Sequence, residues 1–469
     1  MLTYDFEHID GPIYMYVYKC IKNDIISGVL KPGEKLPSKR TFASNNGIST
    51  ITIQNAYDQL ISEGYIYTMP KKGYYVANIE GMVRSVANTD VSYDIHMPEN
   101  ESYEFDLSGN GINPENFPFS VWAKLLREVM SNNKEELMEI APTSGVRVLR
   151  EAIANHLKSF RGMLVDPNQI VIGAGTEYLY GLIIQLLGKD NTYAIENPGY
   201  KKLKKIYEQH NIKCRYASMD DDGVTVEGLL KSETDIAHIC PNHHFPTGIT
   251  MPASRRYEIL SWANAREGRY IIEDDYDSEF RLEGKPIPTL FSIDACEKVI
   301  YMNTFSKSLS PTIRISYMVL PVHLAKEFYR RMSFYSCTVS NFEQYTLAKF
   351  ISEGYFEKHI NRMRLYYTRQ RKKIIDIIEK SELGKHCEIL ENYSGLHFLI
   401  KLDTTYSDET IGQKLKSLGI KMRTLSEYYF TDEKEKQHLF IVNYSNLDEK
   451  EAERAIELIE EEYIEIGRI

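Results

Sequence analysis

The sequence has few cysteines, no long apolar run and no general excess of positive charge. The cysteines show no CxxC or other metal-ligand spacing, so we expect reduced thiols and no metal site. No apolar run approaches the ~18 residues that a membrane span needs. The opening residues, MLTYDFEHID, lack the apolar core of a secretory signal. These absences predict a cytoplasmic protein. The cysteines are Cys20, Cys214, Cys240, Cys296, Cys337 and Cys387.

The charge is unevenly distributed along the 469 residues. The length exceeds what one hydrophobic core usually organises, so more than one domain is expected. Residues 1–78 carry 8 Lys and Arg against 7 Asp and Glu, a net charge of +1. The remainder carries 48 against 59, a net charge of -11. This difference suits a near-neutral module attached to an acidic body.

Three regions differ in pattern: residues 1–78, a polar linker at 79–104, and residues 105–469. In the third region, apolar runs alternate with helical patterns near 176–187, 200–210 and 252–267, which predicts a mainly parallel α/β sheet. After about residue 320, long amphipathic helices precede further strand-like runs. We therefore divide this region into a large domain (about 105–320) and a small one (about 321–469). The predicted strands are Ile170–Ile172, Thr192–Ile195, Ile236–Ile239, Tyr270–Ile272, Val299–Met302, Leu396–Leu402 and Leu439–Asn443.

The first region reads as short helices followed by a hairpin. Apolar residues at helical spacing predict a first helix that stops at Gly28. Ser38 can cap a short second helix that ends at Gly47, and Ser49 begins a third whose outer side is polar. Two short helices joined by a tight turn match helix-turn-helix geometry, although a plain three-helix bundle shows the same periodicity. A tyrosine-rich hairpin over 65–76 would form a wing with a basic tip.

The sequence of this region resembles the GntR-type winged helix-turn-helix. The segments that carry the resemblance are LKPGEKLPSKR, AYDQLISEGYI and KKGYYVA. The resemblance implies binding to double-stranded DNA. The family usually has an arginine where Thr50 stands, so fewer phosphate contacts and more reliance on Arg40, the wing and dimerisation are expected. The implied DNA contacts are Ser38, Arg40, Ser49, Thr50, Thr52, Gln54, Lys71 and Lys72.

The passage YMNTFSKSLSPTIRISY carries the strongest chemical signal. Lys307 follows a buried strand and is flanked by hydroxyls, as Schiff-base chemistry with an aldehyde cofactor requires. Thr304 and Ser306 can donate to a phosphate, and Arg314 adds a cationic fork. A lone Ser-Lys-Ser would more often be a surface loop.

A second signal lies at the end of an upstream strand, IIEDDY. Alternation places Asp274 and Tyr276 on one side and Glu273 and Asp275 on the other. A carboxylate there can keep a pyridine nitrogen protonated, and a phenol can hydrogen-bond the O3′ of the ring. By itself, such an acidic cluster would suggest a metal site or a solvated edge.

A glycine-rich turn, GAGTE, follows a strand and opens a helix. Gly175 would let the backbone N–H groups of Thr176 and Glu177 approach an anion, with help from the positive end of the helix dipole. Alone, this turn is weak evidence for a phosphate site.

Together these segments resemble the fold-type I pyridoxal-phosphate enzymes of the aspartate aminotransferase superfamily over about residues 105–469. Further phrases that carry the resemblance are SGVRVLREAIANHL, ENPGY, FPTGITMP and EDDYDSEF. It implies that Lys307, the reacting residue, forms the internal aldimine and that Tyr200 lies beside the cofactor. It also implies that Arg423 binds a substrate α-carboxylate. The remaining implied cofactor contacts are Asp274, Tyr276, Gly175, Thr176, Glu177, Thr304, Ser306 and Arg314.

Two departures count against efficient turnover. The aminotransferase motif Asn-Pro-Thr-Gly appears as Phe245-Pro246-Thr247-Gly248, so the O3′-binding asparagine is missing, and His244 or Asn242 could replace it. The tyrosine that such enzymes place shortly before Gly145 is also absent.

The MocR/GabR regulators consist of a GntR-type DNA-binding domain joined to an aminotransferase-like domain. The whole chain resembles this family. In the family's GABA-responsive member two arginines hold the effector. Arg423 retains one, but Lys202 stands at the other position and lacks the planar bidentate grip. The resemblance implies a regulator with pyridoxal phosphate on Lys307, an amino-compound effector that forms an external aldimine, and a head-to-tail homodimer. The alternatives are a working aminotransferase with a DNA-binding head, a regulator for which the cofactor itself is the signal, and a cofactor-free body.

Overall fold

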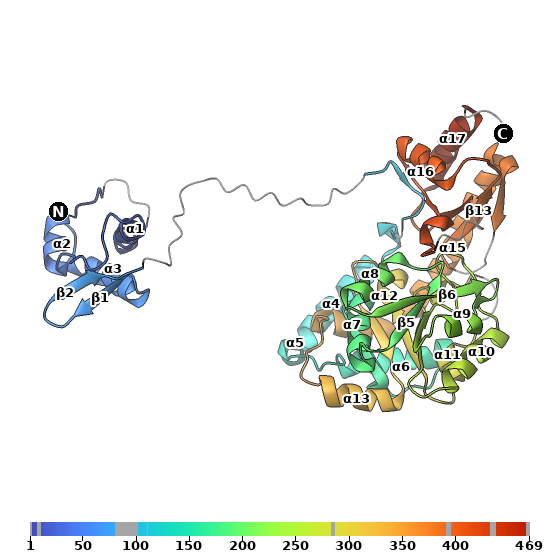
Figure 1. Cartoon of the computed structure of the whole chain (residues 1–469), viewed down its shortest axis with the longest axis horizontal. Helices are drawn as coiled ribbons and strands as arrows, with labels where there is room; N and C mark the ends of the chain where they lie inside the picture. The colour runs from blue at the N-terminus through green and yellow to red at the C-terminus, as the bar shows by residue number, and fades with distance from the viewer. Residues whose placement is uncertain are drawn as a thin grey trace. The chain divides into compact units, whose positions relative to one another are not determined.

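The computed structural model describes residues 2–6, 11–79, 102–109, 111–282, 287–390, 395–431 and 438–465. The chain divides into two compact units, Met1–Asn100 and Glu101–Ile469 (Figure 1). Most of the predicted linker lies outside the described residues. Within the described ranges, no helix is both long enough and apolar enough to cross a membrane.

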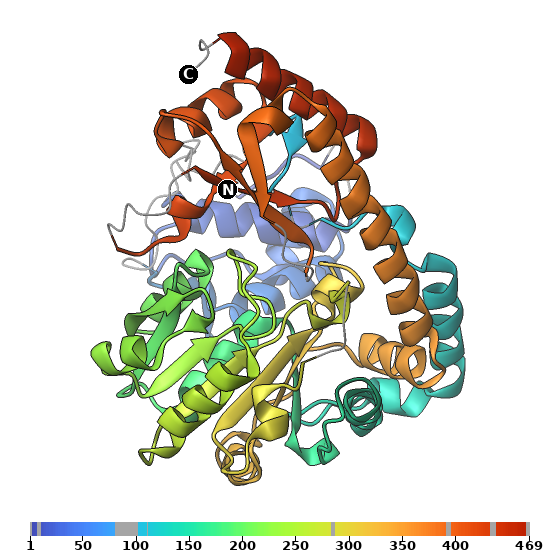
Figure 2. The same ribbon diagram turned by 90° about the vertical axis from the view of Figure 1, so that its right-hand side faces the viewer.

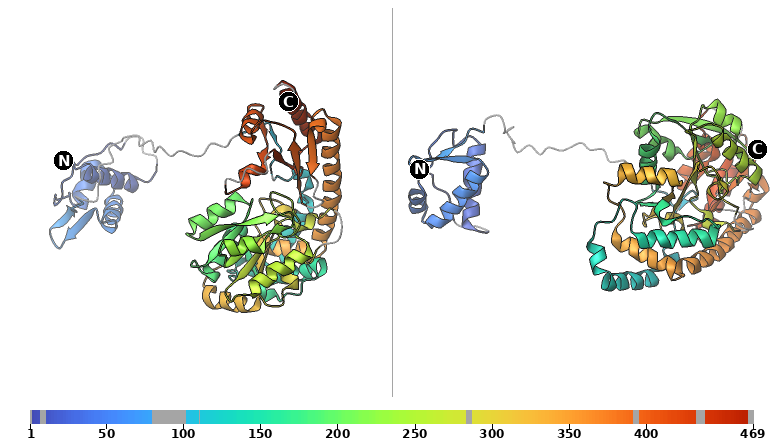
Figure 3. Two further views of the ribbon diagram at one scale, coloured as in Figure 1. Left: turned by 45° about the vertical axis from the view of Figure 1, so that its right-hand side comes forward. Right: turned by 90° about the horizontal axis from the view of Figure 1, so that it is seen from below.

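The first unit is three helices and a two-stranded hairpin (Figure 3), and their apolar side chains form one core. The second helix ends at Gly47, whose φ of 65° is the left-handed conformation that glycine adopts readily. Val17, Ile53 and Leu60 are fully buried, so the apolar faces meet as the spacing predicts. The winged helix-turn-helix is therefore confirmed. Its elements are α1 (Ile13–Ile26), α2 (Lys39–Asn46), α3 (Thr50–Ser62), β1 (Ile66–Met69) and β2 (Gly73–Val76).

The second unit is built on an eight-stranded sheet of order β4-β11-β10-β9-β8-β5-β6-β7. Neighbouring strands from β10 through β9, β8 and β5 to β6 are parallel, whereas β11 and β7 run antiparallel to their neighbours. The prediction of a mainly parallel sheet is confirmed. The strands are β4 (Ile170–Gly173), β5 (Thr192–Asn197), β6 (Lys213–Asp220), β7 (Gly223–Val224), β8 (Ile236–Ile239), β9 (Tyr270–Asp274), β10 (Val299–Thr304) and β11 (Ser316–Val319).

Helices cover both faces of this sheet because successive strand residues point to opposite sides. Ile272 packs into the core under α7 (Thr176–Leu187), α8 (Lys201–Gln209) and α13 (Val322–Met332), whereas Ile271 packs into the core of the other face. That other face is covered by α6 (Arg147–Arg161), α9 (Val226–Lys231), α10 (Ala253–Asn264), α11 (Leu290–Ile293), α14 (Asn341–Ser352) and α15 (Tyr355–Lys380).

A second sheet, of order β12-β13-β16-β15, lies toward the C-terminus. Figure 2 shows the long helix α15, in orange, passing from beside the large sheet to this second sheet. Its strands are β12 (Cys387–Leu390), β13 (His397–Leu402), β15 (Arg423–Thr424) and β16 (Leu439–Asn443), with helices α16 (Asp408–Ser417) and α17 (Glu449–Glu465). The remaining helices and turns are α4 (Phe119–Asn132), α5 (Lys134–Met138), α12 (Phe305–Ser308), η1 (Pro114–Asn116), η2 (Pro167–Gln169), η3 (Ser278–Phe280), η4 (Leu383–His386) and η5 (Leu425–Tyr428).

One short parallel pair joins distant parts of the second unit. Strand β3 (Phe105–Asp106) pairs with β14 (Ile420–Lys421), and the ammonium of Lys421 lies 2.8 Å from the carboxylate of Asp106. The first residues of the unit are thereby tied to the chain just before Arg423.

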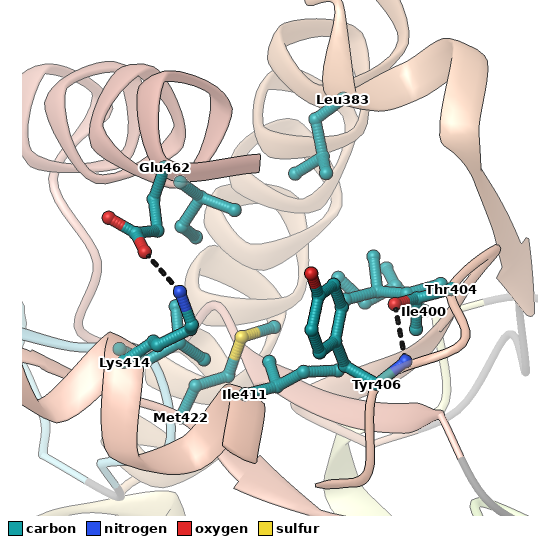
Figure 4. Close-up of a pocket in the computed structure, with 11 residues that line it drawn as sticks. Leu383, Ile400, Thr404, Tyr406, Ile411, Lys414, Met422 and Glu462 are labelled. Carbon is teal, nitrogen blue, oxygen red and sulfur yellow. Dashed lines mark hydrogen bonds and ion pairs between the residues drawn. The ribbon is translucent and has the colours of Figure 1, made fainter. Parts of the chain in front are cut away.

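A small apolar cavity of about 50 Å³ lies between the second sheet, α16 and α17 (Figure 4). Ile400 and Met422 line it, and an ion pair of 2.8 Å between Lys414 and Glu462 closes one side. This cavity is much smaller than the one at the carboxyl ends of the parallel strands.

Candidate functional site

The start of each helix in the helix-turn-helix is capped by a serine. The hydroxyl of Ser38 accepts a hydrogen bond from Thr41 N at 3.2 Å, and that of Ser49 accepts one from Thr52 N at 3.1 Å. Both predicted DNA contacts therefore also fix where α2 and α3 begin. Arg40 is exposed in the first turn of α2.

The outer face of α3 differs in part from the predicted contact surface. Thr50 is exposed and Thr52 is half-buried. The Gln54 amide donates to Asp58 at 2.6 Å and accepts a hydrogen bond from Lys39, so it is held between α2 and α3. A residue that the prediction omitted, Ile51, is 73% exposed on this helix.

The tip of the wing carries two exposed lysines. Lys71 and Lys72 lie in the turn between β1 and β2, and Lys71 adopts a positive φ of 61°. Both side chains are exposed, and their contact with DNA stays a prediction.

A cavity of about 250 Å³ lies in the second unit, at the carboxyl ends of strands β5, β8, β9 and β10 and the first turns of α7 and α8. Ligands of parallel α/β sheets usually bind at this edge. Most of the residues predicted to bind the cofactor or the effector line this cavity. Those in its wall are Thr176, Glu177, Tyr200, Lys202, His244, Asp274, Tyr276, Thr304, Ser306, Lys307 and Arg314.

Lys307 lies in α12, directly after β10, and is half-buried in the wall of the cavity. Burial lowers the pKa of this amine to about 8, and the nearby charge of Asp277 opposes the shift. About a tenth of Lys307 is therefore unprotonated at pH 7, and this free amine is the nucleophilic form.

Only one of the two carboxylate oxygens of Asp274 has a hydrogen-bond partner among the residues that the structure describes. Its Oδ2 accepts the phenolic O–H of Tyr180 at 2.6 Å and lies 3.4 Å from His238 Nε2, whose Nδ1 lies 2.7 Å from the Tyr207 hydroxyl. Its Oδ1 is buried and has no hydrogen-bond partner among the residues that the structure describes. An unpaired buried carboxylate oxygen is costly unless a ligand supplies the donor.

The neighbouring acids point away from the cavity, as the alternation predicts. The carboxylate of Glu273 accepts the backbone N–H groups of Leu290 and Phe291 at 3.0 and 2.9 Å. That of Asp275 contacts Arg161 at 2.7 Å and the Asn242 amide at 2.8 Å. Asn242 is thus used in this buried network and does not replace the missing asparagine of the cavity.

His244, the other suggested replacement, does line the cavity. Its Nδ1 lies 2.7 Å from the hydroxyl of Thr247, and its Nε2 lies 3.5 Å from Glu196 Oε2. Burial lowers the pKa of His244 to about 3 and raises the pKa of Glu196 to about 8. The imidazole is therefore neutral, and the acid holds its proton at neutral pH.

Aromatic groups complete this side of the cavity. The Tyr276 hydroxyl lies 3.2 Å from His243 Nδ1, and that nitrogen lies 2.8 Å from the carboxylate of Asp277. Tyr200 meets Phe245 edge to face, with the ring centroids 6.1 Å apart. Tyr200 is 47% exposed and so has room to lie over a ligand.

The opposite end of the cavity is suited to an anion. Gly175 has a φ of +92°, and a Cβ there would lie 2.5 Å from Arg314 Nη2, so only glycine lets the guanidinium lie over this turn. The hydroxyl of Thr304 donates to Ser306 Oγ at 2.9 Å. Together with the amino end of α7, these groups form a polar corner that includes the cation of Arg314.

Two predicted effector contacts are already paired. The Lys202 ammonium donates to Glu177 across the cavity wall. Arg423 pairs with Glu427 at 3.0 Å and is not among the residues that line the cavity.

The donor set fits pyridoxal phosphate. Lys307 offers an amine, Asp274 Oδ1 lacks a donor, and the corner around Arg314 and Gly175 suits a phosphate. Sequence reasoning missed Tyr180, His238 and Glu196, which lie behind or beside these groups. A histidine inside the apolar strand Ile236–Ile239 was the one signal for this layer.

Comparison with family models divides the chain in the same way as the fold. Residues 13–76 match the model of bacterial regulatory proteins of the gntR family. Residues 106–459 match the model of aminotransferase class I and II.

Curated relatives match nearly end to end. The HTH-type transcriptional regulator YdeL of Bacillus subtilis is 35% identical over 431 residues, which cover 90% of each chain. The probable rhizopine catabolism regulatory protein MocR of Rhizobium meliloti is 29% identical, with 94% of this chain and 92% of the relative covered. The pyridoxine biosynthesis transcriptional regulator PdxR of Corynebacterium glutamicum is 26% identical, with 87% of each covered.

Solved structures match the second unit by fold. A kynurenine aminotransferase of Pyrococcus horikoshii has a TM-score of 0.68 at 22% identity and covers 79% of this chain and 93% of its own. The fold-type I prediction is confirmed at the level of the fold. The DNA-binding domain and the aminotransferase-like domain each match a family model, and the relatives match this chain over nearly its whole length. The chain therefore belongs to the MocR-type HTH transcriptional regulators.

Proposed function

We propose that the chain is a DNA-binding transcriptional regulator that carries pyridoxal phosphate on Lys307 and responds to an amino compound. The observation that carries the proposal is the unpaired Oδ1 of Asp274, in the same cavity wall as the desolvated amine of Lys307. A buried carboxylate oxygen without a donor is what a protonated pyridine nitrogen would satisfy.

Different side chains of the cavity would bind different parts of pyridoxal phosphate. When bound, pyridoxal phosphate supplies an aldehyde that condenses reversibly with primary amines. Lys307 Nζ would hold that carbon, and Asp274 would hold the ring nitrogen. His244 and Tyr276 lie in the wall where the ring hydroxyl would be bound, and Tyr200 would cover the ring. The Gly175 turn, the amides of Thr176 and Glu177, the hydroxyls of Thr304 and Ser306, and Arg314 would hold the phosphate.

An effector amine would compete with Lys307 for the same carbon. Its carboxylate, if it has one, would be drawn to Arg423, which must first leave Glu427. That ion pair is about half exposed, and such pairs contribute only about 0–1 kcal/mol, so the exchange costs little. Lys202, which lines the cavity, would offer that carboxylate a second cation.

The DNA response would require two DNA-binding domains, because helix-turn-helix proteins bind paired half-sites as dimers. Three exposed apolar side chains support a second copy as the partner. Met138, Ile140 and Phe334 are each more than 70% exposed. The Asn341 amide donates to Glu139 O at 2.8 Å and so ties the segment of Ile140 to the chain that follows Phe334. We propose a head-to-tail homodimer that acts in the cytoplasm.

The proposal is tested by the visible absorption of the purified protein, titrated with amino acids, amines and D-amino acids, alongside binding to its operator DNA. We expect a band from the Lys307-bound cofactor that one amine changes persistently, with a change in DNA affinity. Absence of any band, or failure of borohydride to fix the cofactor to Lys307, would refute the cofactor assignment.

Two other outcomes would assign a different function. Repeated amino transfer with release of a keto acid would make the chain an aminotransferase, the activity named for its structural neighbour. A band that no amine disturbs, together with DNA binding that depends on the cofactor, would make the cofactor the signal. The name of the relative PdxR, a regulator of pyridoxine biosynthesis, favours that second outcome.

A further inference from the structure

One carboxylate bridges two cations in the cavity wall. Glu177, in the first turn of α7, accepts a hydrogen bond from Lys202, in the first turn of α8. Its other oxygen lies 3.3 Å from Nη2 of Arg314, in the loop between α12 and β11. The three side chains are 41%, 54% and 50% exposed, so each can move.

The guanidinium of Arg314 thereby has two uses. It lies over the Gly175 turn, at the corner suited to a phosphate, and it is also an ion-pair partner of Glu177. A phosphate held at this corner would repel a carboxylate on the same guanidinium, because both are anions. Lys202 offers the carboxylate a counter-ion that is not part of the phosphate corner.

We propose that Glu177 is an internal competitor of the cofactor phosphate. It occupies Arg314 when the corner is free, and it withdraws onto Lys202 when the phosphate binds. The inference rests on the proposed function, since it requires that the cavity binds pyridoxal phosphate. Under this proposal the side chain of Glu177 sets the affinity for the cofactor. Lys202 is then primarily the ion-pair partner of Glu177 and only secondarily a contact for the effector.

The test compares the dissociation constants of pyridoxal phosphate and of pyridoxal, which lacks the phosphate, by absorbance at one pH and salt concentration. In Glu177→Gln the competing charge is gone. We expect the ratio of the pyridoxal constant to the pyridoxal-phosphate constant to rise about two- to fivefold, the size expected for one partly exposed ion pair. Glu208→Gln, which removes a negative charge from α8 and from its pairing with Lys204, is the matched control and should leave the ratio unchanged.

A double-mutant cycle tests the role of Lys202. Lys202→Met should weaken pyridoxal-phosphate binding more in the natural chain than in Glu177→Gln, because only the natural chain loses the place to which Glu177 withdraws. Additive effects would refute this role, and an unchanged or lower ratio in Glu177→Gln would refute the competition. Failure of the natural chain and all variants to bind pyridoxal phosphate would instead overturn the proposed function, and the inference with it.

Discussion

The phenolic O–H of Tyr180 donates to Oδ2 of Asp274 at 2.6 Å and fixes the carboxylate, whose Oδ1 has no partner within the described part of the chain. The two residues are 94 positions apart and come from α7 and from the end of β9. Tyr180 therefore orients the group that would face the ring nitrogen of the cofactor.

This relationship predicts a graded loss of cofactor affinity. Asp274→Ala removes the charged partner and should weaken pyridoxal-phosphate binding about ten- to hundredfold, the range for a hydrogen bond to a charged group. Tyr180→Phe keeps the carboxylate and should cost less. Absorbance titration measures both, and Asp221→Asn, in the exposed turn between β6 and β7, is the control. Equal losses in the two cavity variants would contradict the assigned roles.

The lowered pKa of Lys307 predicts how cofactor attachment depends on pH. The free amine is the reactive form, so with a pKa of about 8 the rate should rise about tenfold from pH 7 to pH 9 and then level off. Asp277 raises this pKa, so Asp277→Asn should move the midpoint to lower pH. Stopped-flow absorbance, with borohydride fixation and peptide mapping, gives the rate at this lysine. A rate that still rises steeply above pH 10 would show an ordinary, solvated amine.

The turn at Gly175 predicts a loss that depends on the phosphate. Gly175→Ala places a methyl 2.5 Å from the Arg314 guanidinium, at a φ that alanine rarely adopts. Affinity for pyridoxal phosphate should fall more than about tenfold, and affinity for pyridoxal should fall much less. Gly188→Ala, at the other end of α7, has a similar φ of +99° and its nearest neighbour at 3.8 Å, so it controls for backbone strain alone. Equal losses for the two ligands would place the phosphate elsewhere.

The wing predicts a salt-dependent contribution to DNA binding. Lys71→Gln with Lys72→Gln should lower the slope of log affinity against log salt by about one unit per lysine, because each phosphate contact releases about one counterion. Fluorescence anisotropy on operator and random duplexes should show similar losses on both. Lys231→Gln, in the second unit, is the control. An unchanged slope would remove the wing from the interface.

Ile51 predicts an effect on sequence preference. Its side chain is 73% exposed on α3, where an apolar group can contact a thymine methyl. Ile51→Ala should weaken operator binding more than random-duplex binding, with the salt slope unchanged. Equal weakening on both duplexes would instead point to a structural role.

The buried acid Glu196 predicts a pH-dependent stability difference. Its pKa is raised from 4.5 to about 8, so the folded state holds a proton that the unfolded chain releases. This contribution is complete below about pH 4.5 and is lost as the pH rises to about 8. Glu196→Gln removes the titration, so its melting temperature relative to the natural chain should rise from pH 5 to pH 8 and then stay level. A difference that does not depend on pH would contradict the raised pKa.

Features fixed by local chemistry could be predicted from the sequence. The serine caps of α2 and α3 and the left-handed Gly47 needed only neighbouring residues. Strand alternation predicted that Asp274 and Tyr276 lie on the same side of the sheet, and both residues line the cavity.

Features that depend on long-range packing could not be predicted in this way. The contact between Tyr180 and Asp274 requires the sheet order. Gln54 was expected on the outer face of its helix, but its amide also accepts a hydrogen bond from Lys39, and this contact requires the packing of α2 against α3. The pairing of Arg423 with Glu427 is different, because a spacing of four residues between opposite charges was visible in the sequence.

The pairing of β3 with β14 determines where the connection to the DNA-binding unit is anchored. Glu104 N donates to Gly419 O at 2.9 Å and Leu107 N donates to Lys421 O at 2.9 Å, so the chain leaving toward that unit is hydrogen-bonded to the segment that leads into Arg423. A shift of this segment would displace the anchor of the connecting chain with it. Arg423, one of the proposed effector contacts, is thus only two residues from the strand that anchors the start of the second unit.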